Sequence, residues 1–461
     1  MTTFRKEHDS LGEIPVPASC YWGAQTQRSL QNFTLHQYRM PLNVIYALAT
    51  IKKASALANF ELKLLPEHKK ELICKVCDEI LLGVHDNEFP LSLWQTGSGT
   101  QTNMNVNEVI TNRGHVLSGG LLSNSVKILH PNDDVNMSQS SNDVFPSAMH
   151  MAATEVLQSF TMPALLTLQK TLKQKSKQFS KIIKTGRTHM MDATPITLGQ
   201  EFSGYTSLVT NGILRLKQAS KRLMELALGG TATGTGLNTV KGYDKLVVKH
   251  INQITEKKFV AGKNKFELMS AHDAIVEVHA ALKQLAVSLH KISCDIRLMS
   301  SGPRCGLNEL ILPVNEPGSS IMPGKTNPTQ IEALSMACAQ ICGNDVSIGI
   351  AAMNGQFELN VYKPVIVKNL LESLLILGDT ARSFAEKCIR GVRVNYKTLD
   401  KNLQASLMLN TVLSTHIGYE KAAKIAQIAS KNDLSLRDAA LKSGYVNQEE
   451  YDKWIDVNNM V

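Results

Sequence analysis

One segment near the middle of the chain carries a heptad pattern that constrains the fold more than any other feature. Between residues 274 and 300, apolar side chains recur at alternating intervals of three and four residues. These side chains are Ile275, Val278, Leu282, Leu285, Leu289, Ile292, Ile296 and Met299. The spacing places them on one face of an α-helix, and that face must pack against other helices. At 1.5 Å per residue the helix would be about 40 Å long, more than one small domain needs.

A second segment, residues 370–388, repeats the pattern. Its apolar positions are Leu370, Leu374, Leu377, Ala381, Phe384 and Cys388. Two long seams predict a helical bundle, and helices of this length favour a bundle that other subunits complete.

The chain is too long for one hydrophobic core, since it has 461 residues, so we expect several domains. Residues 1–138 form the first, with helical segments near 41–60 and 67–83. Residues 139–392 hold the long amphipathic segments and form a central helical bundle domain, and residues 393–461 form a small C-terminal helical domain. The expected fold class is all-α with three domains.

Charge and composition leave several classes of protein open. Hydrophobic residues make up 43% of the chain and charged residues 19%, as in ordinary globular proteins. The net charge of +9 fits a nucleic-acid-binding surface, the steering of a small anionic substrate, or a merely solvated surface. Lysine and arginine are spread along the chain without a run of five or six, which favours the solvated surface.

The N-terminal residues and the lengths of the apolar runs indicate in which cellular compartment the protein is expected. No run of 18 or more apolar residues is present, so no transmembrane helix is expected. The first residues include the acidic Glu7 and Asp9 and lack an apolar stretch. This pattern is unlike a secretory signal or a transit peptide, so we expect a cytoplasmic protein.

The eight cysteines do not form a metal-binding pattern. Cys74 and Cys77 make one C-x-x-C pair, and Cys338 and Cys342 are four residues apart, but neither has a second matching pair or a histidine at zinc-finger spacing. The segment around Cys74 has helical periodicity, so buried free thiols are the preferred interpretation. We expect neither zinc nor an iron–sulfur cluster.

Four polar segments punctuated by glycine interrupt the helical pattern. They span residues 95–105, 130–136 with 138–143, 186–195 and 318–328. Their hydroxyl and amide side chains are suited to binding carboxylate oxygens, although the same residue types favour turns and helix caps. Four such segments, each next to a long helix, favour a binding site. The Gly-rich segment 229–236 lacks the lysine of a phosphate-binding P-loop, and no H-E-x-x-H or G-x-S-x-G motif is present.

Here the sequence resembles a known family. GSSIMPGKTNP, at 318–328, is similar to the signature loop of the fumarase/aspartase superfamily, whose members eliminate a group β to a carboxylate. Gly324 fits fumarases, because aspartases usually have alanine there. GRTH, with His189, also resembles fumarases, whereas aspartases have GRTQ. WGAQTQRS, TGSGTQTNMN, HPNDDVN and SQSSND are of the same kind, and the resemblance to class II fumarases runs from Phe4 to Trp454.

The resemblance implies a fold, an activity and an assembly. The expected fold is the three-domain fumarase/aspartase-like fold, whose long central bundle completes a core of twenty helices in a homotetramer with active sites shared between three subunits. The implied reaction is the reversible hydration of fumarate to L-malate in the tricarboxylic acid cycle. No metal, organic cofactor, nucleic acid or membrane is implied as a partner.

The resemblance also assigns three catalytic residues, His189, Ser319 and Glu332. Ser319 would take the C3 proton from malate, which leaves a carbanion whose charge flows into the carboxylate as an aci form. A serine is a poor base unless activated, and successive backbone N–H groups together with Lys325 are suited to activate it. His189 would assist proton transfer on the oxygen side through a water, and Glu332 would orient it. The division of acid and base roles comes from the family alone.

Two sets of binding residues follow from the same resemblance. The substrate-binding set is Ser98, Gly99, Thr100, Ser140, Ser141, Asn142, Thr188, Ser320 (through its backbone N–H), Lys325, Thr326 and Asn327. A secondary anion site near the entrance would comprise Lys127, His130, Pro131, Asn132 and Asp133. The sequence departs from the family at Lys127, where arginine is common, at Met190 and Met191, where Leu-Gln is common, and at Thr326, where valine is common. Arg187 and Glu201 are expected to form structural ion pairs.

Three other interpretations remain. An aspartase-type ammonia-lyase of the same superfamily is opposed by His189 and Gly324. A catalytically silent structural homologue is opposed by the complete set of catalytic residues. A nucleic-acid-binding protein would need a basic motif that the sequence lacks.

Overall fold

The computed structural model describes residues 3–35 and 37–461, which divide into two compact units. Unit 1 is Met1–Met162, Leu214–Gln284 and Ala339–Ile376, and unit 2 is Pro163–Ile213, Leu285–Cys338 and Leu377–Val461. The domain boundaries after residues 138 and 392 stay a prediction.

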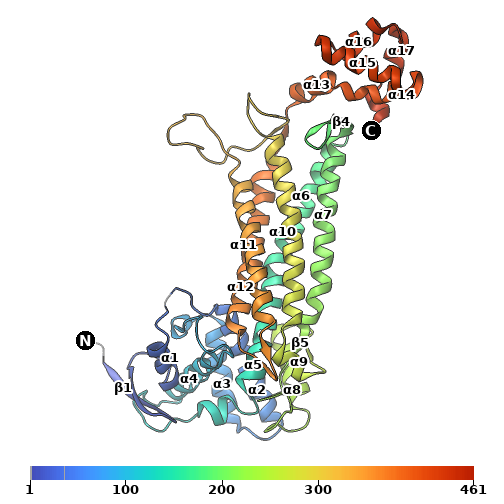
Figure 1. Ribbon diagram of the computed structural model, residues 1–461. Coiled ribbons are helices and arrows are strands. Elements are labelled where there is room, and N and C mark those ends of the chain that lie inside the picture. The colour runs from blue at the N-terminus through green and yellow to red at the C-terminus, as the bar shows by residue number, and fades with distance from the viewer. Residues whose placement is uncertain (1–2, 36) are drawn as a thin grey trace. The chain divides into compact units, whose positions relative to one another are not determined.

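Long helices dominate the chain, and the predicted all-α class is confirmed (Figure 1). Five of the long helices are α6 (Met162–Gln178), α7 (Leu198–Ala219), α10 (Asp273–Met299), α11 (Thr329–Ala352) and α12 (Lys363–Ser383). The strands of the described residues form only two-stranded sheets. The boundary between the units crosses α7, α10, α11 and α12, so each unit contains part of these helices.

Both predicted seams are buried. All eight apolar positions of the α10 seam are at most 4% exposed, and the six positions of the second seam are at most 3% exposed. The second seam runs along α12 and into a π-helical turn, Phe384–Cys388. Because these values belong to a single chain, the seams do not by themselves require other subunits. That part of the sequence argument for an oligomer was wrong.

Unit 1 packs around α2, a helix of small and aliphatic residues. Its other elements include β1 (Phe4–Asp9), β2 (Gly12–Pro17), α1 (Ala24–Asn32), α2 (Leu42–Glu61), α3 (Glu67–Leu81), α4 (Thr100–Leu117), α5 (Ser141–Val156), α8 (Tyr243–Thr255) and α9 (Lys265–Ser270). Helix α2 contacts α3, α5 and α8, and most of its side chains are buried. The predicted helices near 41–60 and 67–83 are confirmed as α2 and α3.

Unit 2 contains an antiparallel hairpin and a cluster of short helices. The hairpin pairs β3 (Ile183–Thr188) with β4 (Met191–Thr197), and the helices are α13 (Tyr396–Ala405), α14 (Asn410–Ile417), α15 (Tyr419–Asn432), α16 (Leu436–Ser443) and α17 (Gln448–Trp454). These helices share a hydrophobic cluster that includes Leu413, Ile425 and Ala439. Gly418, at φ +86°, separates α14 from α15. No described helix is long and apolar enough to cross a membrane.

A buried histidine on α5 makes the stability of unit 1 depend on pH. His150 is 3% exposed, and its Nδ1 donates to the carbonyl oxygen of Glu225 at 2.8 Å. Burial lowers the pKa of His150 to about 4. Between this value and about 6.5 the unfolded chain binds a proton that the folded chain does not bind, so acidification through this range destabilises the fold.

We therefore expect His150→Asn to make the fold less sensitive to acid. The substituted amide can still donate to the Glu225 carbonyl, but it cannot take up a proton. From pH 7 to pH 5 the His150 contribution is a loss of about 2 kcal/mol, so thermal midpoints should fall less in the variant than in the wild type. Titration of other buried groups, such as Asp143, is common to both proteins and cancels in the comparison. Equal falls would contradict the assignment.

Candidate active site

Three predicted substrate-binding hydroxyls lie together in unit 1, at the starts of α4 and α5. Ser98 Oγ lies 2.9 Å from Thr100 Oγ1, which lies 2.7 Å from Ser141 Oγ. Thr100 and Ser141 are the first residues of their helices. The first N–H groups of a helix lack internal partners and carry partial positive charge. Two helix starts bearing hydroxyls form a suitable place for a carboxylate.

Two glycines let the segment before α4 lie against its neighbours. Gly99 has φ +79°, and a Cβ there would lie 2.3 Å from the ring of Phe145. A Cβ on Gly97 would lie 1.3 Å from the carbonyl oxygen of Val361. The backbone N–H of Lys363 also donates to the Gly97 carbonyl oxygen at 3.0 Å. Only glycine permits these contacts, which fix the backbone on both sides of Ser98.

A capping box fixes the start of α5. The Ser140 hydroxyl accepts from the N–H of Asn142 at 3.2 Å, and Asp143 Oδ1 accepts from the N–H of Ser140 at 2.9 Å. Asp143 Oδ2 accepts from the N–H groups of Gly229 and Thr231 at 2.9 and 3.1 Å, which explains the Gly-rich segment as a structural loop. Burial raises the pKa of Asp143 to about 6.

Asn142, also predicted to bind substrate, is held by the same loop. Its Nδ2 donates to the carbonyl oxygen of Ala232 at 2.8 Å. This contact fixes the side chain at the α5 start, next to Ser141.

The predicted secondary anion site forms a tight turn in the same unit. His130 precedes the π-helical turn Pro131–Val135, which contains Asn132, and its Nδ1 accepts from the N–H of Asp133 at 3.1 Å. The backbone N–H of His130 donates to Asp134 at 2.8 Å, and Asp134 pairs with Lys69 at 2.8 Å.

Lys127 approaches the same place from the preceding loop. Lys127, His130 and Pro131 line a hollow of about 750 Å³. The amine of Lys127 donates to the carbonyl oxygen of Leu122 at 2.6 Å and lies 3.5 Å from Glu7. Burial lowers the pKa of Lys127. An anion would therefore compete with two existing contacts for this amine.

In unit 2, the β3–β4 hairpin presents His189 at its tip. Thr188 ends β3, and His189 and Met190 follow with φ values of +56° and +64°. Two consecutive positive φ values are typical of a two-residue hairpin turn. Thr188, His189 and Met190 are all exposed. The hairpin thus supports the predicted catalytic histidine at an accessible point.

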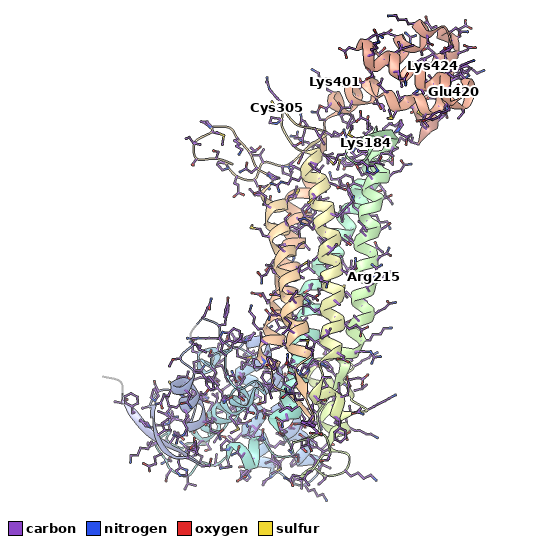
Figure 2. The ribbon with its side chains drawn as sticks, in the orientation of Figure 1. Lys184, Arg215, Cys305, Lys401, Glu420 and Lys424 are labelled. Atoms are coloured by element: carbon purple, nitrogen blue, oxygen red, sulfur yellow. The ribbon has the colours of Figure 1, made fainter. Side chains whose placement is uncertain are left out.

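Buried ion pairs fix the base of this hairpin. Lys184, labelled in Figure 2, is 2% exposed and lies 3.0 Å from both Glu201 and Glu309. Arg187 lies 2.6 Å from Glu309. Arg187 and Glu201 are therefore in structural ion pairs, as predicted, but with Glu309 and Lys184 and not with each other.

The loop that carries Ser319 is closed by its own hydrogen bonds. The N–H of Gly318 donates to the carbonyl oxygen of Lys325 at 2.8 Å, and Asn327 Nδ2 donates to the carbonyl oxygen of Gly318 at 2.6 Å. Ser319 Oγ accepts from the N–H groups of Ile321 and Met322 at 3.2 and 3.0 Å. Two N–H groups aimed at one hydroxyl oxygen stabilise negative charge on it, which is what a serine base needs.

The remaining loop residues are accessible, and Glu332 lies just beyond the loop. Ser320, Lys325 and Thr326 are exposed. Glu332, in the first turn of α11, lies 3.6 Å from Arg297. Among the described residues no hydrogen bond or ion pair joins His189 to Glu332, so the predicted carboxylate–histidine pair does not form within one chain.

Comparisons with known proteins identify the family to which the chain belongs. Residues 12–343 match the family model described as Lyase, and residues 409–461 match the one described as Fumarase C C-terminus. A class II fumarate hydratase of Pasteurella multocida is 54% identical over 100% of this chain and 99% of its own length. A mitochondrial fumarate hydratase of Rhizopus oryzae is 54% identical over 99% of this chain and 93% of its own length. The crystal structure of a class II fumarase from Schistosoma mansoni superposes with a TM-score of 0.97, at 44% identity over 99% of both chains.

The chain belongs to the class II fumarate hydratase family.

Two supporting residues of this class II fumarate hydratase fold belong to no motif in the sequence. Glu309, which joins Lys184 to Arg187, lies in no recognisable motif, and only its burial reveals it. Lys52 is indicated in the sequence only by its position within the largely apolar helix α2.

Gly99→Ala should be far more destabilising than Gly119→Ala. Both glycines have positive φ and flank α4, but a Cβ on Gly119 would meet nothing within 4 Å. The left-handed backbone alone costs about 1–2 kcal/mol in either variant. Overpacking against Phe145 adds roughly 1–3 kcal/mol in Gly99→Ala. Equal thermal midpoints would show that the contact with Phe145 is relieved without cost.

Proposed function

We propose that the protein catalyses the reversible hydration of fumarate to L-malate, as a hydro-lyase of the tricarboxylic acid cycle. The reaction is supported by 54% sequence identity to fumarate hydratases over nearly the whole chain. The observation that carries the proposal is the geometry of Ser319, whose hydroxyl oxygen accepts two backbone N–H groups in the loop that holds Lys325.

The substrate is a dianion, and neutral donors hold one of its carboxylates. Ser98, Thr100 and Ser141 share a hydroxyl chain at two helix starts, with Asn142 beside it. Lys325 supplies a positive charge for the other carboxylate. The full binding set that we propose is Ser98, Gly99, Thr100, Ser140, Ser141, Asn142, Thr188, Ser320, Lys325, Thr326 and Asn327.

The proposed chemistry divides proton transfer between two residues. With Ser319 as the base, its alkoxide takes the C3 proton of malate and becomes the hydroxyl, and the electron pair of the broken C–H bond moves into the adjacent carboxylate as an aci form. Backbone N–H groups and Lys325 stabilise the charge that develops. The electron pair then returns from the aci-carboxylate to form the C2=C3 double bond as the C2–O bond breaks, and His189 delivers a proton, through a water, to the leaving hydroxyl. The products are fumarate and water.

We further propose that Lys127, His130, Pro131, Asn132 and Asp133 form a secondary anion site. The hollow shared by Lys127 and His130 supports this assignment. The contacts of Lys127 with Glu7 and Leu122 make it a weak site.

We propose that the active form is a homotetramer in which another subunit supplies a carboxylate to His189. Within one chain Glu332 pairs with Arg297. Support comes from an uncharged, exposed stripe along and just beyond α11, formed by Ala333, Met336, Ala339, Gly343, Val346, Ile350 and Met353. Met336, Val346, Ile350 and Met353 are 53–77% exposed. A helix that is apolar on nearly every face is ordinarily buried on every face.

Ser319→Ala should abolish most turnover, and Ser320→Ala is its matched control. Loss of a positioned base typically costs about 10²–10⁴-fold in rate, whereas Ser320 is proposed to act through its backbone N–H, which alanine retains. The measurement is fumarate formation from L-malate by chelator-treated protein, followed by ultraviolet absorbance. Equal activity of the Ser319→Ala variant and the wild type would exclude this base.

The same assay separates the alternatives. Release of fumarate from L-aspartate, without turnover of malate, would identify an ammonia-lyase. A folded tetramer inactive on both substrates would identify a silent homologue.

Val346→Glu should break the assembly, and Leu82→Glu should not. Leu82 is 81% exposed at the end of α3 and lies outside the α11 stripe. A carboxylate in an apolar interface is costly to bury, whereas one on an open surface is not. Light scattering during gel filtration should give the mass of four chains for the wild type and Leu82→Glu, and fewer for Val346→Glu. A tetrameric Val346→Glu variant would place the interface elsewhere.

A further inference from the structure

Helix α2 contains a lysine whose side chain is completely buried. Lys52 is 0% exposed, and its amine donates to Asn136 Oδ1 and Gln139 Oε1, both at 2.9 Å. Both acceptors are neutral amide oxygens. Burial lowers the pKa of Lys52 to about 7, against the opposing charge of Asp143. A lysine is rarely kept in such a place for packing alone, because an aliphatic side chain would fill it at lower cost.

The first acceptor, Asn136, connects Lys52 to the helix that begins at the candidate site. Asn136 Oδ1 also accepts from the side-chain amides of Asn103 and Asn107, at 3.1 and 3.2 Å. Both belong to α4, the helix that starts at Thr100. One amide oxygen therefore joins α2, α4 and the turn at residues 136–139.

That turn leads directly into the second hydroxyl segment. Asn136 Nδ2 donates to the carbonyl oxygen of Gln139 at 3.1 Å, and Ser140 and Ser141 follow in the chain. Asn59, two helical turns beyond Lys52 on α2, holds the same turn: it donates to the carbonyl oxygen of Met137 at 3.1 Å and accepts from Ser138 at 2.9 Å. The hydroxyls of Thr100 and Ser141 thus come from two segments that share one buried anchor.

We propose that Lys52 is a positioning residue of the dicarboxylate site, which holds the 136–139 turn against α4 and so sets the hydroxyl chain of Ser98, Thr100 and Ser141. This inference rests on the proposed function, because it takes the ligand of these hydroxyls to be a substrate carboxylate. Without the amine, the oxygens of Asn136 and Gln139 each lose a buried donor, and the turn is held less tightly against α2.

The test compares Lys52→Met with Lys53→Met in the full-length assembled enzyme. Methionine keeps the length of the side chain and removes the donor. Lys53 is the adjacent residue of α2 but pairs with Asp78 at 2.6 Å near the surface, so it is the matched control. Ground-state and transition-state binding of one carboxylate should weaken together, so the KM for L-malate should rise about tenfold in Lys52→Met while kcat changes less. Lys53→Met should have wild-type constants.

A second pair of variants separates positioning from general loss of stability. Asn136→Leu should also raise the KM, and the double variant Lys52→Met/Asn136→Leu should be no worse than the poorer single variant, because both substitutions break one connection. Multiplying effects would overturn the proposal. If Lys52→Met does not fold, Gln139→Met replaces it as the test, because this variant leaves Asn136 as the partner of Lys52. Gln139→Met should then raise the KM by less than Asn136→Leu does. An unchanged KM would overturn the proposal.

The outcomes distinguish this proposal from the proposed reaction. An active wild type with an unchanged KM in Lys52→Met overturns the positioning role alone. A lowered thermal midpoint with unchanged KM assigns Lys52 to stability only and also overturns it. A folded wild type that does not turn over malate overturns the proposed reaction, and the positioning role with it.

Discussion

Exclusion of water from the apolar helix seams is the interaction on which the candidate site depends. The α10 seam is buried along its whole length, and burial of this kind is the main stabilising contribution to a helical fold. A helix that is fixed by packing also has its first residues fixed in position. Thr100 and Ser141 begin α4 and α5, and the loop that carries Ser319 directly precedes α11. These positions offer unpaired N–H groups and partial positive charge, which suit a dianionic substrate better than mid-helix positions would.

The sequence predicted the seams and the polar segments because both are local patterns. Helical periodicity places every seam residue on one face whatever the partner helices are. It does not reveal what covers that face, so it cannot show whether the covering helices belong to the same chain or to another subunit. The positive φ of His189 and the pairing of Glu332 with Arg297 likewise depend on neighbours that no spacing rule names. The motifs identified the candidate residues, but not the contacts that hold them.

The contacts of buried charged side chains also cannot be predicted from the sequence. In each unit, such contacts support a loop that carries candidate site residues. In unit 2, Glu309 forms ion pairs with both Lys184 and Arg187 at the base of the hairpin that carries His189. In unit 1, Lys52 contacts only amide oxygens among its hydrogen-bond partners. Burying a charge costs several kcal/mol even when it is paired. Both clusters lie behind candidate site residues, so their cost is better explained by orientation of those residues than by stability.

The exposed stripe on α11 lies on the same helix as Glu332, so the proposed subunit interface and a proposed catalytic residue share one helix. Glu332 opens the helix, and the uncharged stripe extends from Ala333 to Met353. Two features therefore coincide on one helix: an exposed apolar face, and the carboxylate of Glu332, which we propose to be catalytic and which pairs with Arg297 in its own chain. Association through this face would exclude water from it. It would also bring a second copy of the chain to the start of α11, where the proposed contact between Glu332 and a histidine of another subunit would form.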